Sequence, residues 1–115
     1  MDQHSIEQAQ ADICKQYGHQ FLACPIDSIL GIAVHTLGHQ TLNGLRHEPE
    51  GNTNGWYIWG GEHSSASDFF SPQHTAHLLE KAPKLMNYLG LPPGCRFLLA
   101  KDFADVWFDS ALLNT

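Results

Sequence analysis

The sequence predicts an α+β fold, because segments with helical spacing of apolar residues alternate with short segments rich in aromatic and β-branched residues. With 115 residues, 43% of them hydrophobic, the chain has the length and apolar content of one domain around one core. We expect an N-terminal helix, a mainly antiparallel sheet of four to five strands, and an inserted helical pair before a C-terminal hairpin. Residues 1–115 are taken as a single domain.

Near the N-terminus, apolar side chains recur every three or four positions from Ser5 to Tyr17, which predicts a helix. Ser5 is suited to the N-cap position, and Gly18 to a left-handed residue after the last turn. After a break at Pro25, the β-branched segment 29–37 predicts a buried strand.

The next predicted strands are a short extended segment, 42–47, and the segment Trp56–Trp59, separated by the polar loop 48–55. Glycines on both sides of the Trp-Tyr-Ile-Trp run mark its ends. Because strand side chains alternate, Trp56 shares a face with Ile58 and Tyr57 shares the other with Trp59. We expect both faces to be covered.

The second half of the chain begins with a polar loop, 64–71, in which Ser71–Pro72 predicts the N-cap and first position of a helix reaching Lys81. Pro83 opens a second short helix, to Tyr88. Segments 96–100 and 105–109 predict two strands joined as a hairpin by residues 101–104. Trp107 on the second strand is expected in the core, as is Trp56.

The charge of the chain excludes several classes of partner. A formal net charge of −6 argues against binding to nucleic acid or to an anionic membrane and favours a basic protein surface. The apolar runs span only a few residues, far fewer than the roughly 20 that cross a bilayer. No secretory leader pattern is seen and the three cysteines lack disulfide or zinc spacing, so we expect a cytoplasmic protein.

The histidines do not form a metal-binding pattern. His35 and His39 have the spacing of a helical zinc pair, but they fall in a predicted strand and turn, with Thr36 where a metalloprotease has glutamate. His74 and His77 can share a helix face, yet no third ligand accompanies them at suitable spacing. We therefore expect no metal.

Catalytic motifs are also missing from the sequence. It contains no nucleophile elbow, no phosphate-binding glycine loop and no dinucleotide fingerprint, so we expect no catalytic residue and no cofactor. An enzyme that uses His47, Cys24 or Cys95 as an unusual base or nucleophile is the least favoured alternative.

Five phrases in a fixed order resemble a known bacterial family: NGLRH (43–47), GWYIWGGE (55–62), DFFSP (68–72), YLGLPPG (88–94) and DVWFD (105–109). The family is that of immunity proteins from polymorphic toxin systems, the thirty-third in the usual numbering. The resemblance extends from about Gly31 to Leu113 and leaves residues 1–30 outside it. It implies a small cytoplasmic protein that binds and neutralises a cognate protein toxin, with the oligomeric state left open.

The expected partner-facing segment is the loop from Gly60 to Ser71, whose ends are held by a strand and a helix. Successive extended side chains point in opposite directions, so we expect either Phe69 or Phe70 to be exposed as an anchor, unless both cover the core. The candidate partner-binding residues are Glu62, Asp68, Phe69, Phe70 and Arg46.

Two alternatives remain for the residues of this region. Arg46 can instead pair with a carboxylate inside the protein. The aromatic strand can line a ligand pocket near Trp59 and Arg46, which would make the chain a small-molecule-binding or regulatory module.

Overall fold

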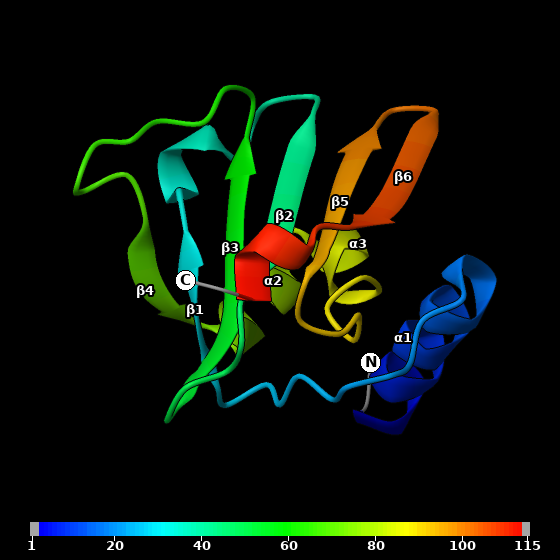
Figure 1. The fold of residues 1–115 in the computed structure, drawn as a ribbon. Helices are drawn as coiled ribbons and strands as arrows, with labels where there is room; N and C mark the ends of the chain where they lie inside the picture. The colour runs from blue at the N-terminus through cyan, green and yellow to red at the C-terminus, as the bar shows by residue number, and fades with distance from the viewer. Residues whose placement is uncertain (1–2, 114–115) are drawn as a thin grey trace.

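A computed structural model describes residues 3–113 as a six-stranded sheet with two short helices, 75–81 and 83–86, packed on one face (Figure 1). The strand order is β4-β1-β3-β2-β5-β6, and only the β1–β3 pair is parallel among these strands. The elements follow one another as α1 (Gln3–Tyr17), β1 (Ile29–Ile32), η1 (Val34–Thr36), β2 (Leu42–Arg46), β3 (Thr53–Gly60), β4 (Ser71–His74), α2 (Thr75–Lys81), α3 (Pro83–Met86), β5 (Cys95–Ala100), β6 (Phe103–Phe108) and η2 (Ser110–Leu113). The α+β prediction is confirmed, with one strand more than expected.

The N-terminal helix starts earlier than the sequence predicts. Because α1 already includes Gln3, Ser5 lies inside the helix, and the prediction of Ser5 as N-cap is wrong. Residues 1–2 and 114–115 of the predicted domain lie outside the described residues. The other end agrees with the prediction, since the helix ends at Tyr17 and Gly18 has φ +76°.

One stripe of α1 attaches it to the helical layer. Ile6, Gln10 and Cys14 recur every four positions and are all buried. The Gln10 side chain donates a hydrogen bond to the Met86 carbonyl oxygen at 2.9 Å, and the Cys14 thiol lies 3.2 Å from the Gly90 carbonyl oxygen. These contacts place the first helix against α3 and the loop after it.

The first strand is shorter than the predicted 29–37 segment, because the chain turns into the 3-10 helix η1 after Ala33. Thr36 explains the turn. Its hydroxyl donates to the Ala33 carbonyl oxygen at 2.6 Å and accepts from the Gly60 amide at 2.8 Å, so a local polar contact replaces strand pairing.

The Ser71–Pro72 prediction is wrong, since both residues belong to the edge strand β4 and α2 begins at Thr75. Strand β4 pairs antiparallel with β1, and proline is tolerated there because an edge strand does not need every backbone donor. The inserted helical pair itself is confirmed. Pro83 opens α3 as predicted, although the helix ends at Met86 rather than Tyr88.

The C-terminal hairpin is confirmed with a tighter connection. Ala100 pairs with Phe103, so only Lys101 and Asp102 connect the strands instead of residues 101–104. Strand β6 therefore begins before residue 105, and its last residue is Phe108.

The two sheet faces are covered unequally. Trp56 and Ile58 are fully buried on the face packed against the helices, as predicted, whereas the other face carries only a small cluster around Trp59. On that second face Tyr57 is 38% and Trp107 39% exposed, so the expectations of two covered faces and a core Trp107 are wrong. The main core on the helical side contains Ile6, Cys14, Cys24, Leu30, Ile32, Trp56, Ile58, Leu78, Leu85, Met86, Leu89, Leu91, Cys95, Phe97 and Val106.

Candidate functional site

The sheet face opposite the helices, here called the open face, carries a row of side chains that crosses four strands. Register places Tyr57 on β3 opposite Leu45 on β2, Leu45 opposite Arg96 on β5, and Arg96 opposite Trp107 on β6. Residues directly opposite in a sheet point to the same face, so these side chains are neighbours. The row is apolar and aromatic apart from Arg96.

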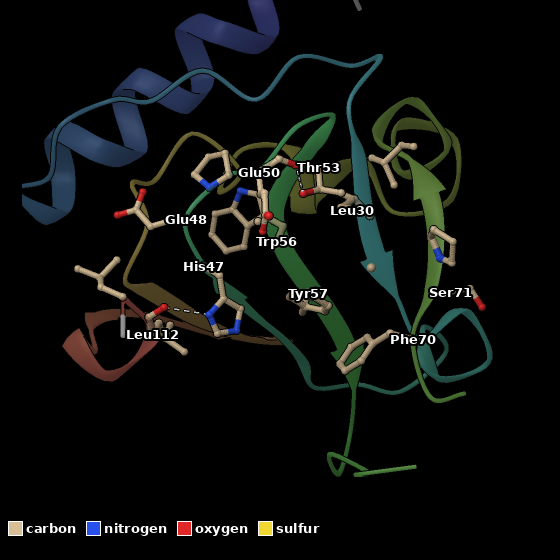
Figure 2. A pocket seen from close by; sticks show the side chains of 16 residues that line it. Leu30, His47, Glu48, Glu50, Thr53, Trp56, Tyr57, Phe70, Ser71 and Leu112 are labelled. Atoms are coloured by element: carbon tan, nitrogen blue, oxygen red, sulfur yellow. Dashed lines mark hydrogen bonds between the residues drawn. The ribbon is translucent and has the colours of Figure 1, made fainter. Parts of the chain in front are cut away.

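A pocket of about 690 Å³ lies at the β3 end of this row (Figure 2). Gly31 on the neighbouring strand makes room for the Tyr57 ring, because a Cβ at residue 31 would lie 2.8 Å from Tyr57 Cδ1. The rings of His47 and Phe70 stand almost perpendicular to that of Tyr57, with centroids 5.5 and 5.2 Å away. The exposed side chains of Glu48 and Glu50 belong to the lining as well.

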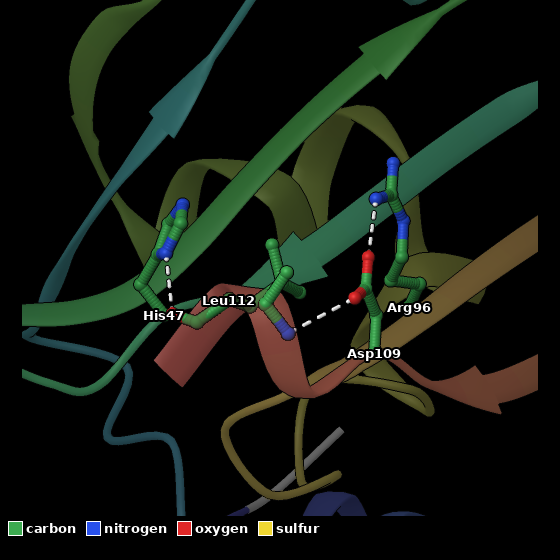
Figure 3. Close-up of polar contacts among 5 residues, drawn as sticks. His47, Arg96, Asp109 and Leu112 are labelled. Carbon is green, nitrogen blue, oxygen red and sulfur yellow. Dashed lines mark hydrogen bonds and ion pairs between the residues drawn. The ribbon is translucent and has the colours of Figure 1, made fainter. Parts of the chain in front are cut away.

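The C-terminal turn η2 forms one wall of the pocket by folding in front of the sheet, opposite α2 and α3 (Figures 1 and 3). Asp109 pairs with Arg96 at 3.0 Å, and its backbone amide donates to the Gly94 carbonyl oxygen at 2.7 Å. His47 Nδ1 lies 2.9 Å from the Leu112 carbonyl oxygen. A carbonyl only accepts, so Nδ1 carries the proton in this contact. Three contacts thus hold the segment against the open face.

The two phenylalanines of the predicted partner-facing loop touch, with ring centroids 4.9 Å apart, but they differ in burial. Phe69 is buried, with its ring 5.6 Å from that of His35, whereas Phe70 is half-buried and turns toward Tyr57 at the pocket (Figure 2). Glu62 and Asp68 are exposed on the connection between β3 and β4. Of this group, Glu62 and Asp68 are at the surface, whereas Phe70 packs partly buried against the cluster around Trp59, so neither phenylalanine is fully exposed.

Arg46 is inside the protein, with 1% of its surface exposed. Its Nη1 donates to the carbonyl oxygens of Leu91 at 2.7 Å, Leu22 at 3.2 Å and Leu89 at 3.3 Å, and its Nε donates to Asn54 at 2.8 Å. Burial lowers the pKa of Arg46, but a guanidinium stays charged in proteins. Backbone carbonyls thus take the place of the carboxylate considered in the sequence analysis, and Arg46 is not available to a partner.

Comparison with known proteins identifies the family. A family model described as the Imm33-like domain matches residues 9–109, which is most of the chain. The chain belongs to the Imm33-like family. Searches among curated proteins and among solved structures found no match. The family match confirms the resemblance carried by the five phrases, and it begins at residue 9, so it also includes most of α1.

In this Imm33-like chain the pocket is lined by neighbours of Trp59 and Arg46 rather than by these two residues. Trp59 is 5% exposed and packs with Ala33 and Phe69, and neither Trp59 nor Arg46 lines the pocket. Tyr57, two positions earlier on the same face of β3, lies there instead. Sequence reasoning missed His47 and the C-terminal turn as pocket walls, because only the fold brings them together.

The structure also bears on the possible metal ligands and on the character of the helices. The prediction that His74 and His77 share a helix face is wrong, because His74 ends strand β4 and only His77 lies on α2, although their rings meet edge to face with centroids 6.1 Å apart. Within residues 3–113, no three His, Cys, Asp or Glu side chains are grouped so that they could hold a metal ion. No helix in this same range combines the length and apolar character needed to cross a membrane.

The three cysteines of this chain are buried thiols. Burial raises the pKa of Cys14 and Cys24, and it raises that of Cys95 from 9.0 to about 11, with a smaller contribution from Cys14. A nucleophilic cysteine needs an accessible thiolate and a lowered pKa. The arrangement of these side chains is therefore unsuited to thiolate chemistry near neutral pH.

We expect the thiols to make stability fall at alkaline pH. A folded pKa above the unfolded one favours the protonated native state, so the contribution is complete below pH 9 and is lost as pH rises toward about 11. Urea melts at pH 8, 9.5 and 10.5 measure this loss. Cys95→Ala is the control for other groups that titrate there, and an equal loss in this variant would contradict the assignment to Cys95.

Proposed function

We propose that this protein is a cytoplasmic, non-catalytic immunity protein that binds a cognate toxin through the open face and neutralises it. Membership of the Imm33-like family carries the proposal. The aromatic side chains on the open face support it, since Tyr57 is 38%, Trp107 39% and Phe103 58% exposed. Tyrosine and tryptophan are enriched where protein interfaces contribute most of their affinity.

Charge on and around the open face indicates a basic partner. Arg96 lies on this face but is paired with Asp109, and Lys15, Lys81 and Lys84 lie on helices. Lys101 is exposed at the rim, in the β5–β6 turn beside Asp102. Complementary charge speeds the encounter of two proteins and selects against wrong partners. The exposed acidic side chains around the open face are Glu48, Glu50, Glu62, Asp68 and Asp105.

The residues that we propose to contact the toxin combine sequence and structural evidence. Glu62, Asp68 and Phe70 are retained from the sequence analysis because they are at least partly exposed. Tyr57 and Trp107 are added because register places them on the open face. Phe69 and Arg46 are left out of this set because both are buried.

Protection of a host cell is the direct test of the proposed function. The product of the neighbouring gene is expressed as the candidate toxin in a sensitive bacterium with and without the protein, and survival is counted. We expect survival only when both are present and the two proteins purify as a complex. Loss of viability despite soluble, folded protein would contradict the proposal.

Charge reversal tests which surface is used. We expect Glu62→Lys and Asp68→Lys each to slow association with the toxin by about tenfold at low salt, because exposed charges steer the encounter. Stopped-flow rates at several salt concentrations measure the effect, with folding checked by circular dichroism. Glu80→Lys on α2 is the matched control, since it makes the same charge change on the helical side. If all three variants behaved alike, the toxin would bind elsewhere.

A further inference from the structure

The pocket on the open face has an aromatic floor. Tyr57 keeps 38% of its surface exposed there, and His47 and Phe70 meet its ring at interplanar angles of 81° and 75°, so neither stacks flat on it. A cation within about 6 Å of such a ring face is attracted by the ring quadrupole. The floor is therefore suited to an apolar or cationic group.

The charges of the pocket favour a cation. Its 16 lining residues include Glu48 and Glu50 but neither lysine nor arginine. Both glutamates lie toward the Trp56 and His47 end of the pocket (Figure 2). Transfer of their carboxylates out of water without a cationic partner would cost free energy. A positively charged occupant would compensate that cost.

The loop that carries these carboxylates is built to hold its shape. The amides of Glu50 and Thr53 each donate to the other's carbonyl oxygen, at 3.2 and 3.0 Å, and the Thr53 hydroxyl donates to Glu50 at 2.7 Å. Gly51 makes the turn with φ +59°. The backbone at residue 50 is thus positioned before any partner arrives, which lowers the entropic cost of binding.

We propose that this pocket receives an arginine side chain of the partner protein, stacked on Tyr57 and paired with Glu48 and Glu50. The inference rests on the proposed function, since it names the group of the toxin that the open face recognises. The volume of about 690 Å³ is within the range of ligand sites and leaves space for the backbone that carries the side chain. Arginine fits better than lysine, because its planar guanidinium stacks on aromatic rings and donates to carboxylates in pairs.

The probe for this pocket is Nα-acetyl-arginine methylamide, titrated into the full-length protein and followed by amide chemical shifts in NMR. We expect saturable shifts at residues 31, 57 and 112, which come from three walls of the pocket. The citrulline analogue has nearly the same shape without the charge, and we expect it to bind at least tenfold more weakly. Equal binding of both probes, or shifts outside the pocket, would overturn the proposal.

A double variant tests the two carboxylates. We expect Glu48→Gln/Glu50→Gln to weaken binding of the arginine probe at least tenfold. The matched control, Asp12→Asn/Glu80→Gln, removes the same charge from exposed positions on α1 and α2 and should bind the probe normally. Equal effects of the two double variants would contradict a specific site.

The experiments distinguish a failure of the arginine-pocket assignment from a failure of the proposed immunity function. A protein that protects cells from the toxin yet shows no arginine-probe binding keeps its function and loses this pocket assignment. A protein that binds the probe but protects no cell keeps the cation pocket, and the immunity function is then rejected.

Discussion

Replacement of Trp56 by alanine is expected to lower the free energy of unfolding by about 3–5 kcal/mol, the range for emptying a large buried aromatic site. Trp56 is fully buried, and its ring centroid lies 5.4 Å from that of Phe97. Its Nε1 donates to the Leu89 carbonyl oxygen at 2.9 Å, so the substitution also leaves a buried acceptor without this donor. Guanidinium melts followed by circular dichroism measure the loss.

Trp107→Ala is the matched control, because it removes the same side chain from another strand of the same sheet. Trp107 is 39% exposed on the edge strand β6, and the Arg96 guanidinium lies 6.0 Å from its ring centroid. We expect a loss of no more than about 1 kcal/mol, as for most surface substitutions. Similar losses in the two variants would mean that the open face is as well packed as the helical face.

The contrast between these tryptophans shows how far alternation along a strand can predict burial. The pattern correctly divides Trp56 and Ile58 from Tyr57 and Trp59, because side chains of a strand leave on alternate faces. It does not say which face is covered, or that Trp107 lies on an edge strand. Those properties depend on where the helices pack and on the order of the strands. The local sequence of a strand contains neither piece of information.

The Ser71–Pro72 pair shows a second limit of local signals. Serine followed by proline fits both a helix start and an edge strand, since neither position requires the missing proline N–H. Pairing with β1 decides between them: Pro72 lies opposite Gly31, and helix α2 begins only at Thr75. Tertiary contacts thus decide where the helix begins, although the helix itself was predictable from its apolar spacing.

The sequence predicts which kinds of side chain form the candidate site better than it predicts where the pocket lies. The acidic and aromatic character of the segment around Glu62 and Phe70 is read directly from the sequence. The pocket beside it needs a contact between His47 and Leu112, which are 65 positions apart. It also needs Gly31 opposite Tyr57 in a parallel pair of strands. Neither contact follows from a periodic pattern of residues, so a single sequence does not reveal it.

Substitution of Arg46 is expected to have the second large effect on stability. The sequence alone does not indicate which groups accept the hydrogen bonds of its guanidinium. The five carbonyl oxygens around its guanidinium belong to the segment before β1, to the loop after α3 and to β3: Leu22, Ala23, Asn54, Leu89 and Leu91. One side chain thus joins three parts of the chain that are distant in sequence. A hydrogen bond that involves a charged group contributes about 1.5–3 kcal/mol.

We expect Arg46→Lys to destabilise the protein by about 3 kcal/mol, although it keeps the charge. A lysine ammonium has three donors at one point and cannot reach carbonyl oxygens spread around a planar guanidinium, so buried acceptors lose their donors. The charge would also stay buried with fewer hydrogen bonds. Urea melts measure the loss, and hydrogen exchange at residues 18–26 should show whether the segment that Arg46 holds opens first.

Arg96→Lys is the control for this substitution, because Arg96 is partly exposed and makes one ion pair, with Asp109. Exposed ion pairs contribute little, so we expect a change within about 0.5 kcal/mol. An Arg46→Lys variant as stable as Arg96→Lys would mean that water or backbone movement satisfies the carbonyl oxygens. If instead only Arg46→Lys loses stability and its exchange rises first at residues 18–26, the guanidinium is what holds the N-terminal segment to the sheet.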